Sequence, residues 1–378
     1  MIRLAAIFLL LRRMDNNLLY KIGITQIPLV GSVTAKTLIA YCGGVEAVFR
    51  EKKANLLKIP GIGKITANAI VNQVVLQRAQ EEVEFIEKND VKPLFYTDKD
   101  YPLRLKQCED SPLLLYYRGN SPLETEHVLA VVGTRNATNY GKKMTEEIIS
   151  GLKDTGALII SGLAYGIDIC AHRSALGAGL NTIAVVAHGH DIIYPSEHAN
   201  TANKILQNGG ILTEFLTGTI PSRENFPMRN RIVAGLADAI LVVESKESGG
   251  ALITAEIALS YNREVLACPG RADDICSRGC NKLIQLNKAA LVQSAEEIKD
   301  LLGWKQVKEK RTKQAAFFHN LNHEETLIVE TLKASSAPMY IDDLALQSRI
   351  SPVNLAAHLL SLEFAGILVS LPGKMYTL

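Results

Sequence analysis

The feature that most constrains this chain is the regular alternation, across residues 127–303, of short apolar runs with longer segments of helical spacing. Each run is apolar at nearly every position, which is typical of a strand buried on both faces of a parallel sheet. Strands that alternate with helices predict a doubly wound α/β domain with a mostly parallel sheet. Strands are expected at Leu129–Val132, Ala157–Ser161, Thr182–Ala187, Gly210–Glu214, Ala239–Glu244, Val265–Cys268 and Ala290–Gln293.

The segments that follow these strands carry an unusual set of small, amide and basic residues. Ligands of open parallel sheets bind beyond the carboxyl ends of the strands, so we expect the functional residues there. Small residues let a ligand approach the backbone, arginines match phosphate groups, and basic groups beside an aromatic ring suit single-stranded nucleic acid. The candidate DNA-binding residues are Gly133, Thr134, Arg135, Ser161, Gly162, Arg223, Asn225, Phe226, Arg229, Asn230, Arg231, Ser248 and Gly249.

The first of these loops follows the apolar run from Val128 and ends in Arg135. A polar, turn-prone stretch comes next, and helical spacing begins at Lys142. A strand, a tight loop and a helix N-terminus together present backbone N–H groups to an anion. The alternative is an ordinary connection in which Arg135 only caps or packs.

Composition limits the remaining possibilities. The chain has 378 residues, 47% of them hydrophobic and 21% charged, which indicates two or three folded domains. Its net charge of +2 means that a nucleic-acid site must be a local basic patch. Six scattered cysteines favour a reducing compartment, so we expect a cytoplasmic protein. The apolar residues 4–11 are too few to span a bilayer, and we expect translation to start at Met14.

Residues 14–87 are predicted to form a helical domain. Two segments, Ile27–Ile39 and Ile59–Ile70, both read Ile-Pro, a glycine turn and then Thr-Ala in an amphipathic helix. This pattern resembles a pair of helix-hairpin-helix motifs in a SAM-like domain, whose glycine turns approach DNA phosphates without reading sequence. The alternatives are a purely structural hairpin and a protein-contact module.

The rest of the chain divides into three parts. Residues 88–303 are expected to form one extended domain, in which a segment with strand-like stretches near Leu94 and Leu113 packs onto the α/β part. Residues 304–323 are mostly polar and rich in lysine, and are predicted to be a linker. Residues 324–378 are predicted to form a winged helix. Its helix Val353–Phe364 has no Arg or Lys, which favours protein contact or an accessory role over DNA reading.

Three places invite a metal or catalytic interpretation. His188 and His190 could bind a metal, but residues two apart seldom converge without a third ligand. Cys276 and Cys280 lack a second ligand pair. Asp168 could act as a base, but it opens a helix, where the dipole stabilises a carboxylate. No nucleophile or matched acid stands out, so we predict no metal, no cofactor and no catalytic residue.

Taken together, several blocks resemble one known family. They are Val132-Gly-Thr-Arg135, Ser161-Gly-Leu-Ala-Tyr-Gly-Ile-Asp168 with Ala171-His172, Tyr194-Pro195, Phe226-Pro-Met-Arg-Asn-Arg231, Ser248-Gly-Gly-Ala-Leu-Ile-Thr-Ala255 and Pro269-Gly270. In their order and spacing, over about residues 18–303, they resemble the DNA-processing protein A (DprA or Smf) family. The resemblance implies a Rossmann-like sheet and often a C-terminal winged helix.

The resemblance also implies a function. Family members are not enzymes: they bind and protect single-stranded DNA, dimerise, and help to load RecA recombinase during natural transformation. The family's DNA contacts fall on Arg135, Arg223 and Phe226, and its backbone-presenting positions fall on Ser161, Gly162, Ser248 and Gly249. The chain departs from the family at Tyr165, where Lys or Arg is common, at Met228, and in the turn Ala187-His-Gly-His. These departures concern affinity more than fold.

Two other functions remain open at this point. The segment from Ser248 to Glu256 has a passing likeness to the Gly-Gly, Thr and Glu motif of Rossmann-like nucleotide phosphoribohydrolases. A regulator that binds duplex DNA through the winged helix would instead prefer duplex over single strands.

Overall fold

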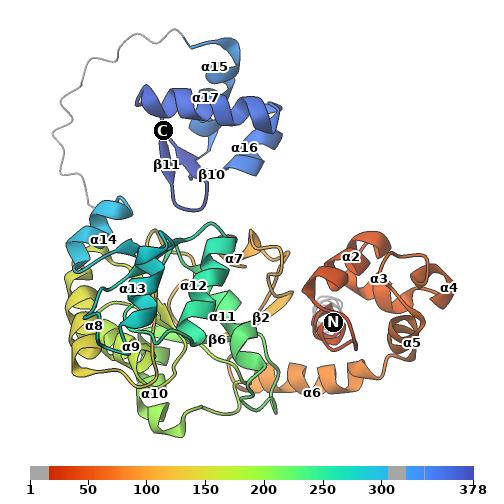
Figure 1. The fold of residues 1–378 in the computed structure, drawn as a ribbon. Helices are drawn as coiled ribbons and strands as arrows, with labels where there is room; N and C mark the ends of the chain where they lie inside the picture. The colour runs from red at the N-terminus through yellow and green to blue at the C-terminus, as the bar shows by residue number, and fades with distance from the viewer. Residues whose placement is uncertain (1–16, 305–320, 336) are drawn as a thin grey trace, which may run out of the picture.

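The computed structural model describes residues 17–304, 321–335 and 337–378. Figure 1 shows a helical N-terminal region, a central α/β body and a small C-terminal unit beside it. Residues 17–25 are helical. They are followed by α2 (Ser32–Cys42), α3 (Val45–Arg50), α4 (Lys53–Leu56), α5 (Lys64–Asn72) and α6 (Val75–Lys88). Gly31 and Gly63 cap α2 and α5, one in each of the two predicted hairpins.

A nine-stranded sheet forms the centre, in the order β1-β2-β6-β5-β4-β3-β7-β8-β9. The predicted alternation is confirmed, because β3 to β9 are all parallel to one another. Two antiparallel strands, β1 and β2, extend the sheet beyond β6. The strands are β1 (Lys92–Phe95), β2 (Leu114–Gly119), β3 (Val128–Val132), β4 (Leu158–Ser161), β5 (Thr182–Val185), β6 (Gly209–Thr213), β7 (Ala239–Val242), β8 (Glu264–Ala267) and β9 (Ala290–Leu291).

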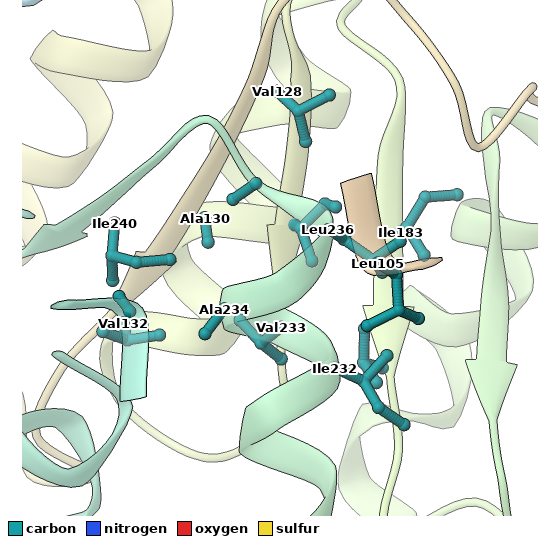
Figure 2. Packing of buried hydrophobic residues seen from close by; sticks show 14 of the residues in the cluster. Leu105, Val128, Ala130, Val132, Ile183, Ile232, Val233, Ala234, Leu236 and Ile240 are labelled. Carbon is teal, nitrogen blue, oxygen red and sulfur yellow. The ribbon is translucent and has the colours of Figure 1, made fainter. Parts of the chain in front are cut away.

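Helices cover both faces of this sheet, which explains why its central strands are continuously apolar. In β3, Val128, Ala130 and Val132 pack into the core on one face, which Figure 2 shows from close by. The intervening Leu129 and Val131 pack into the core on the other face. The first core includes residues of α7 (Leu103–Lys106), α11 (Asn225–Leu236), α12 (Gly250–Ser260) and α13 (Arg278–Gln285). The opposite face is covered by α8 (Asn139–Gly151), α9 (Ile167–Ala178), α10 (Ala199–Gln207) and α14 (Ala295–Leu301).

The strand order changes direction at β3. From β3 the chain adds β4, β5 and β6 on one side, and it then crosses back to add β7, β8 and β9 on the other. The loops that leave the carboxyl ends of β3 and β7 therefore connect to helices on opposite faces of the sheet. Such a switch point opens a crevice outside the strand ends, where ligands of doubly wound folds bind.

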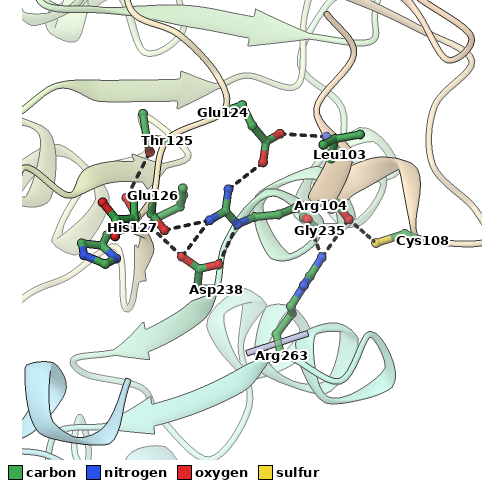
Figure 3. Close-up of polar contacts among 11 residues, drawn as sticks. Leu103, Arg104, Cys108, Glu124, Thr125, Glu126, His127, Gly235, Asp238 and Arg263 are labelled. Atoms are coloured by element: carbon green, nitrogen blue, oxygen red, sulfur yellow. Dashed lines mark hydrogen bonds and ion pairs between the residues drawn. The ribbon is translucent and has the colours of Figure 1, made fainter. Parts of the chain in front are cut away.

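A buried arginine joins the segment before β3 to the domain (Figure 3). Arg104, in α7, donates to Asp238 at 2.6 Å and to Glu124 at 2.7 Å. Arg263 in turn donates to the Arg104 carbonyl at 2.7 Å. Trp304, the last residue described before the gap, is buried near the same network and stacks on His127, with ring centroids 4.7 Å apart. Trp304, which was expected to begin the linker, is therefore part of the α/β core.

The two outer regions differ in how they meet the α/β body. The N-terminal helices share one apolar core with the sheet edge, through Phe95, Leu114 and Tyr116. The C-terminal unit has a core of its own, in the predicted winged-helix arrangement. It consists of α15 (His323–Ala334), β10 (Met339–Tyr340), α16 (Ile341–Ser348), α17 (Pro352–Phe364), β11 (Val369–Leu371) and β12 (Met375–Thr377). Most of the predicted linker, 305–320, lies outside the described residues, as does Met14.

Candidate nucleic-acid interface

A pocket of about 280 Å³ lies at the switch point. The loops after β3, β4 and β7 and the N-terminal turns of α11 and α12 all contribute to it. We call it the switch-point crevice. Nine of the candidate residues line it together: Gly133, Thr134, Arg135, Gly162, Phe226, Arg229, Asn230, Ser248 and Gly249. Strands far apart in the sequence thus deliver their loops to one place, as expected for the carboxyl edge of a parallel sheet.

Arg135 and Phe226 lie in direct contact in the crevice. The guanidinium of Arg135 lies over the Phe226 ring, 4.8 Å from its centroid, which is a cation–π contact. Among the described residues no carboxylate forms an ion pair with Arg135. An exposed guanidinium and a half-buried ring are thus held side by side, one suited to phosphate and the other to a base.

The loop that carries Arg135 is fixed by a buried carboxylate. Glu244, directly after β7, accepts hydrogen bonds from the N–H and the hydroxyl of Thr138. The N–H of Thr134 donates to the Glu244 carbonyl at 2.8 Å, and the Thr134 hydroxyl accepts from the N–H of Asn136. Gly141 is needed because a Cβ there would overlap the Glu244 carboxylate. These hydrogen bonds fix the backbone of the loop that carries Arg135. The N–H of Thr134 already donates to Glu244, so it is not free to bind a phosphate.

Arg229 is in the crevice wall but is not an exposed cation. The residue is 5% exposed, and its Nη1 donates to the Val185 carbonyl at 2.6 Å. It packs so closely on Gly162 that a Cβ at that glycine would overlap the guanidinium. Burial lowers the pKa of Arg229, and the neighbouring Asp168 opposes this shift. Arg229 thus supplies positive potential from beneath the surface, and it anchors α11.

Asp168 is held in the same wall. Its carboxylate accepts from the N–H of Gly162 at 3.1 Å. Burial raises the pKa of Asp168, while Arg229 and backbone N–H groups lower it. Because Gly162 already donates to Asp168, its N–H is not free for a phosphate. Ser161 is also turned inward, since it is fully buried and its hydroxyl donates to the Val131 carbonyl.

The remaining candidates lie around the crevice or away from it. Arg223 is exposed on the loop before α11, and Asn225 holds that loop by donating to the Ile220 carbonyl at 3.2 Å. Arg231 is not brought to the crevice. It pairs with Glu214 and donates to the Asp110 carbonyl in a second pocket, which faces the N-terminal helices. As DNA contacts, all thirteen candidates stay predictions; for Ser161 and Arg231 the side-chain positions argue against the role.

Lys246 lines the crevice and was not among the predicted residues. It is exposed and lies just after β7, so the rule applied to the other strand ends would have found it. The N-terminus of α12 begins beside it, at Gly249 and Gly250, and no side chain in the described part of the chain caps this helix. A helix N-terminus adds positive potential to its surroundings. Lys246, Arg135 and this helix end therefore surround the same space.

The alternative chemistries lack support in the geometry. Glu256, the carboxylate that a phosphoribohydrolase-like motif would use, does not line the crevice and pairs with Lys288 at 2.7 Å. His188 bonds the Gly189 carbonyl and His190 the Tyr116 carbonyl. In the described residues, no group of three or more His, Cys, Asp or Glu could hold a metal ion. Within the same residues, no helix is long and apolar enough to cross a membrane.

Comparison with known proteins gives consistent results. Residues 92–303 match the family model described as DNA recombination-mediator protein A, and residues 319–374 match the DprA winged helix domain. The chain is 31% identical to Protein Smf of Synechocystis, over 94% of this chain and 98% of that protein. It is 41% identical to DNA processing protein DprA of Streptococcus pneumoniae, over 53% of this chain and 71% of that protein.

Two solved structures are also similar. One is the X-ray structure of DprA from Streptococcus pneumoniae, with a TM-score of 0.63 and 32% identity, covering 74% of this chain and 95% of that one. The other is DNA processing protein A from Helicobacter pylori, whose structure concerns its single-stranded DNA binding mode. It has a TM-score of 0.51 and 30% identity, and covers 56% of this chain and 95% of that one.

Proposed function

This chain belongs to the DNA recombination-mediator protein A family, and on that premise we propose that it binds single-stranded DNA in the switch-point crevice. The observation that carries the proposal is the pairing of Arg135 with Phe226 at 4.8 Å, beside Lys246 and the uncapped N-terminus of α12. The single-stranded DNA binding of the similar Helicobacter pylori protein supports the same ligand class.

The geometry suits a strand without sequence preference. Arg135 and Lys246 provide charge for phosphates, and Arg229 adds positive potential from within the wall. The Arg135 guanidinium covers one face of the Phe226 ring. When it moves onto a phosphate, that face is uncovered and a base can stack on it. Every base has such a face, so stacking of this kind tolerates any sequence.

We further propose that the protein is a non-catalytic mediator that protects incoming DNA, acts as a homodimer and loads RecA during natural transformation. Family membership supports this proposal. In a test, RecA would be given single strands already coated by a single-strand binding protein. Adding the chain described here should shorten the delay before RecA begins to hydrolyse ATP. An unchanged delay would contradict RecA loading.

The DNA proposal is tested by titrating oligo-dT and a duplex at two salt concentrations. Oligo-dT should bind more tightly, and Phe226→Ala should weaken its binding by about 1–3 kcal/mol with little change in salt dependence. The same samples, incubated with nucleotide monophosphates, should release no free base. A preference for duplex, or a Phe226→Ala protein that melts early yet binds normally once folded, would contradict the assignment.

A further inference from the structure

A second hollow of about 840 Å³ begins where the switch-point crevice ends. It lies between α8 and α9 and shares Arg135 with the crevice, so the two spaces meet at that side chain. We call it the α8/α9 groove. It runs from Lys142 in the first turn of α8 to Ser150 near the end of that helix. Eight residues of helix correspond to about 12 Å.

Two cations in this groove have no counter-ion among the described residues. Lys142 and Arg173 are exposed and line it from opposite helices, and no described residue forms an ion pair with either. The Arg173 side chain donates a long hydrogen bond, 3.4 Å, to the Thr201 hydroxyl. By contrast, Lys143, next along α8 and outside the groove, is paired with Glu147 at 3.6 Å. The groove carries an excess of positive charge, because Glu146 is the one carboxylate among the described residues that line it.

The rest of the lining leaves room for an extended chain. Small residues, among them Gly166 and Gly177, expose the helix backbones along the groove, and Ser150 and Ser174 add hydroxyl groups. The cationic lining belongs to one groove between two helices. It can follow the single row of phosphates of one strand, whereas a duplex presents two rows.

Tyr165 lies where the α8/α9 groove adjoins a narrow cleft that shares Arg135 and Phe226 with the switch-point crevice. It lines the α8/α9 groove, and it also lines this cleft, which contains Phe226 and Tyr194. The residue is 41% exposed, and its ring packs edge-on against His198, with centroids 4.9 Å apart. An aromatic ring held in place at a junction can stack on a base as a strand turns from one space to the next.

We propose that single-stranded DNA leaving the switch-point crevice passes over Tyr165 and continues in the α8/α9 groove, with its phosphates against Lys142 and Arg173. The inference rests on the proposed function and extends the site to Lys142 and Arg173, which the sequence did not indicate as DNA contacts. It makes the length of the bound strand the decisive variable, because a short strand fills only the crevice.

The experiment compares oligo-dT of about 6 and about 20 nucleotides by fluorescence anisotropy. The double variant Lys142→Ala/Arg173→Ala should bind the short strand like the wild type. It should bind the long strand at least about tenfold more weakly, with a log–log salt dependence shallower by about 1.4 for two lost phosphate contacts. The control Lys143→Ala/Lys153→Ala removes the same charge from exposed positions outside the groove, and should leave both affinities close to those of the wild type.

Three results would overturn the inference. If the groove variant binds the long strand normally, the groove is not on the path of the strand. If the groove variant and the control variant both bind the long strand more weakly, and by the same factor, the effect is one of overall charge. If the wild-type protein binds neither strand, the proposed function fails and the inference fails with it. Both substituted side chains are exposed, so melting temperatures should match that of the wild type, which makes the comparison valid.

Discussion

Arg135 is the residue on which the candidate site depends most. Its side chain is exposed and forms no ion pair with a described residue. Arg135→Ala should weaken binding of all single strands alike, with a salt dependence shallower by about 0.7 for one lost phosphate contact. Arg50→Ala, an exposed arginine in the N-terminal helices, is the matched control. Unchanged affinity and slope in Arg135→Ala would show that the crevice is not the DNA site.

A second property at the residue scale is a pH dependence of stability. His172 is fully buried; its Nδ1 is 2.7 Å from the Thr182 hydroxyl, and its Nε2 has no hydrogen-bond partner among the described residues. Burial, with smaller contributions from Arg229 and His198, lowers its pKa to about 3. In the unfolded chain His172 therefore binds a proton as the pH falls through about 6.5, whereas in the folded protein it stays neutral until about pH 3. The stability contributed by His172 is complete above that pH and is lost as the pH falls toward 3.

This dependence can be measured by urea unfolding followed through Trp304, the single tryptophan. Between about pH 6 and pH 5 the free energy of unfolding should fall more steeply in the wild type than in His172→Gln, by about 1 kcal/mol per pH unit. His190, whose pKa burial lowers to about 4, contributes to both proteins and cancels in the difference. If the free energy of unfolding fell equally with pH in both proteins, His172 would be protonated in the folded protein without loss of stability.

At the scale of elements, the position of α11 depends on a glycine in another element. Gly162, after β4, leaves the space that Arg229 of α11 occupies. Gly162→Ala should displace the guanidinium and break its bond to Val185, at a cost of about 1–3 kcal/mol of stability. Gly177→Ala in α9 has open space around its Cβ and should be neutral or stabilising. Equal melting temperatures for the two variants would show that α11 adjusts freely.

At the scale of the whole molecule, deleting the C-terminal winged helix should disturb the fold of the α/β domain less than deleting the N-terminal helices. The winged helix has its own core, whereas the N-terminal helices share theirs with the sheet edge. A chain that ends at Trp304 should therefore fold and bind oligo-dT nearly as tightly as the full length. A chain that begins at Lys88 exposes Phe95, Leu114 and Tyr116, and should melt earlier or aggregate. Loss of binding in a 1–304 chain that circular dichroism shows to be folded would contradict this expectation.

Much of this architecture follows from the sequence because it depends on local pattern. Runs such as Val128–Val132, apolar on both faces, predict central strands wherever they occur. Parallel strands bring their carboxyl ends to one edge, so Gly133, Arg135, Phe226 and Ser248 could be assigned to one site from the sequence alone. The glycine turns of the N-terminal hairpins and the order of helices in the winged helix are equally local.

Only the tertiary structure decided which side chains face the crevice. Arg229 and Arg231 are two residues apart on α11, and with about 3.6 residues per turn they point about 200° apart. Arg229 therefore turns toward Val185, in the crevice wall, while Arg231 pairs with Glu214 in another pocket. Likewise Ser161 turns into the core, and Lys142 and Arg173 line one groove because α8 packs on α9. Residue type and spacing fix what a segment can form, but the direction of each side chain is set by the partners that its element packs against.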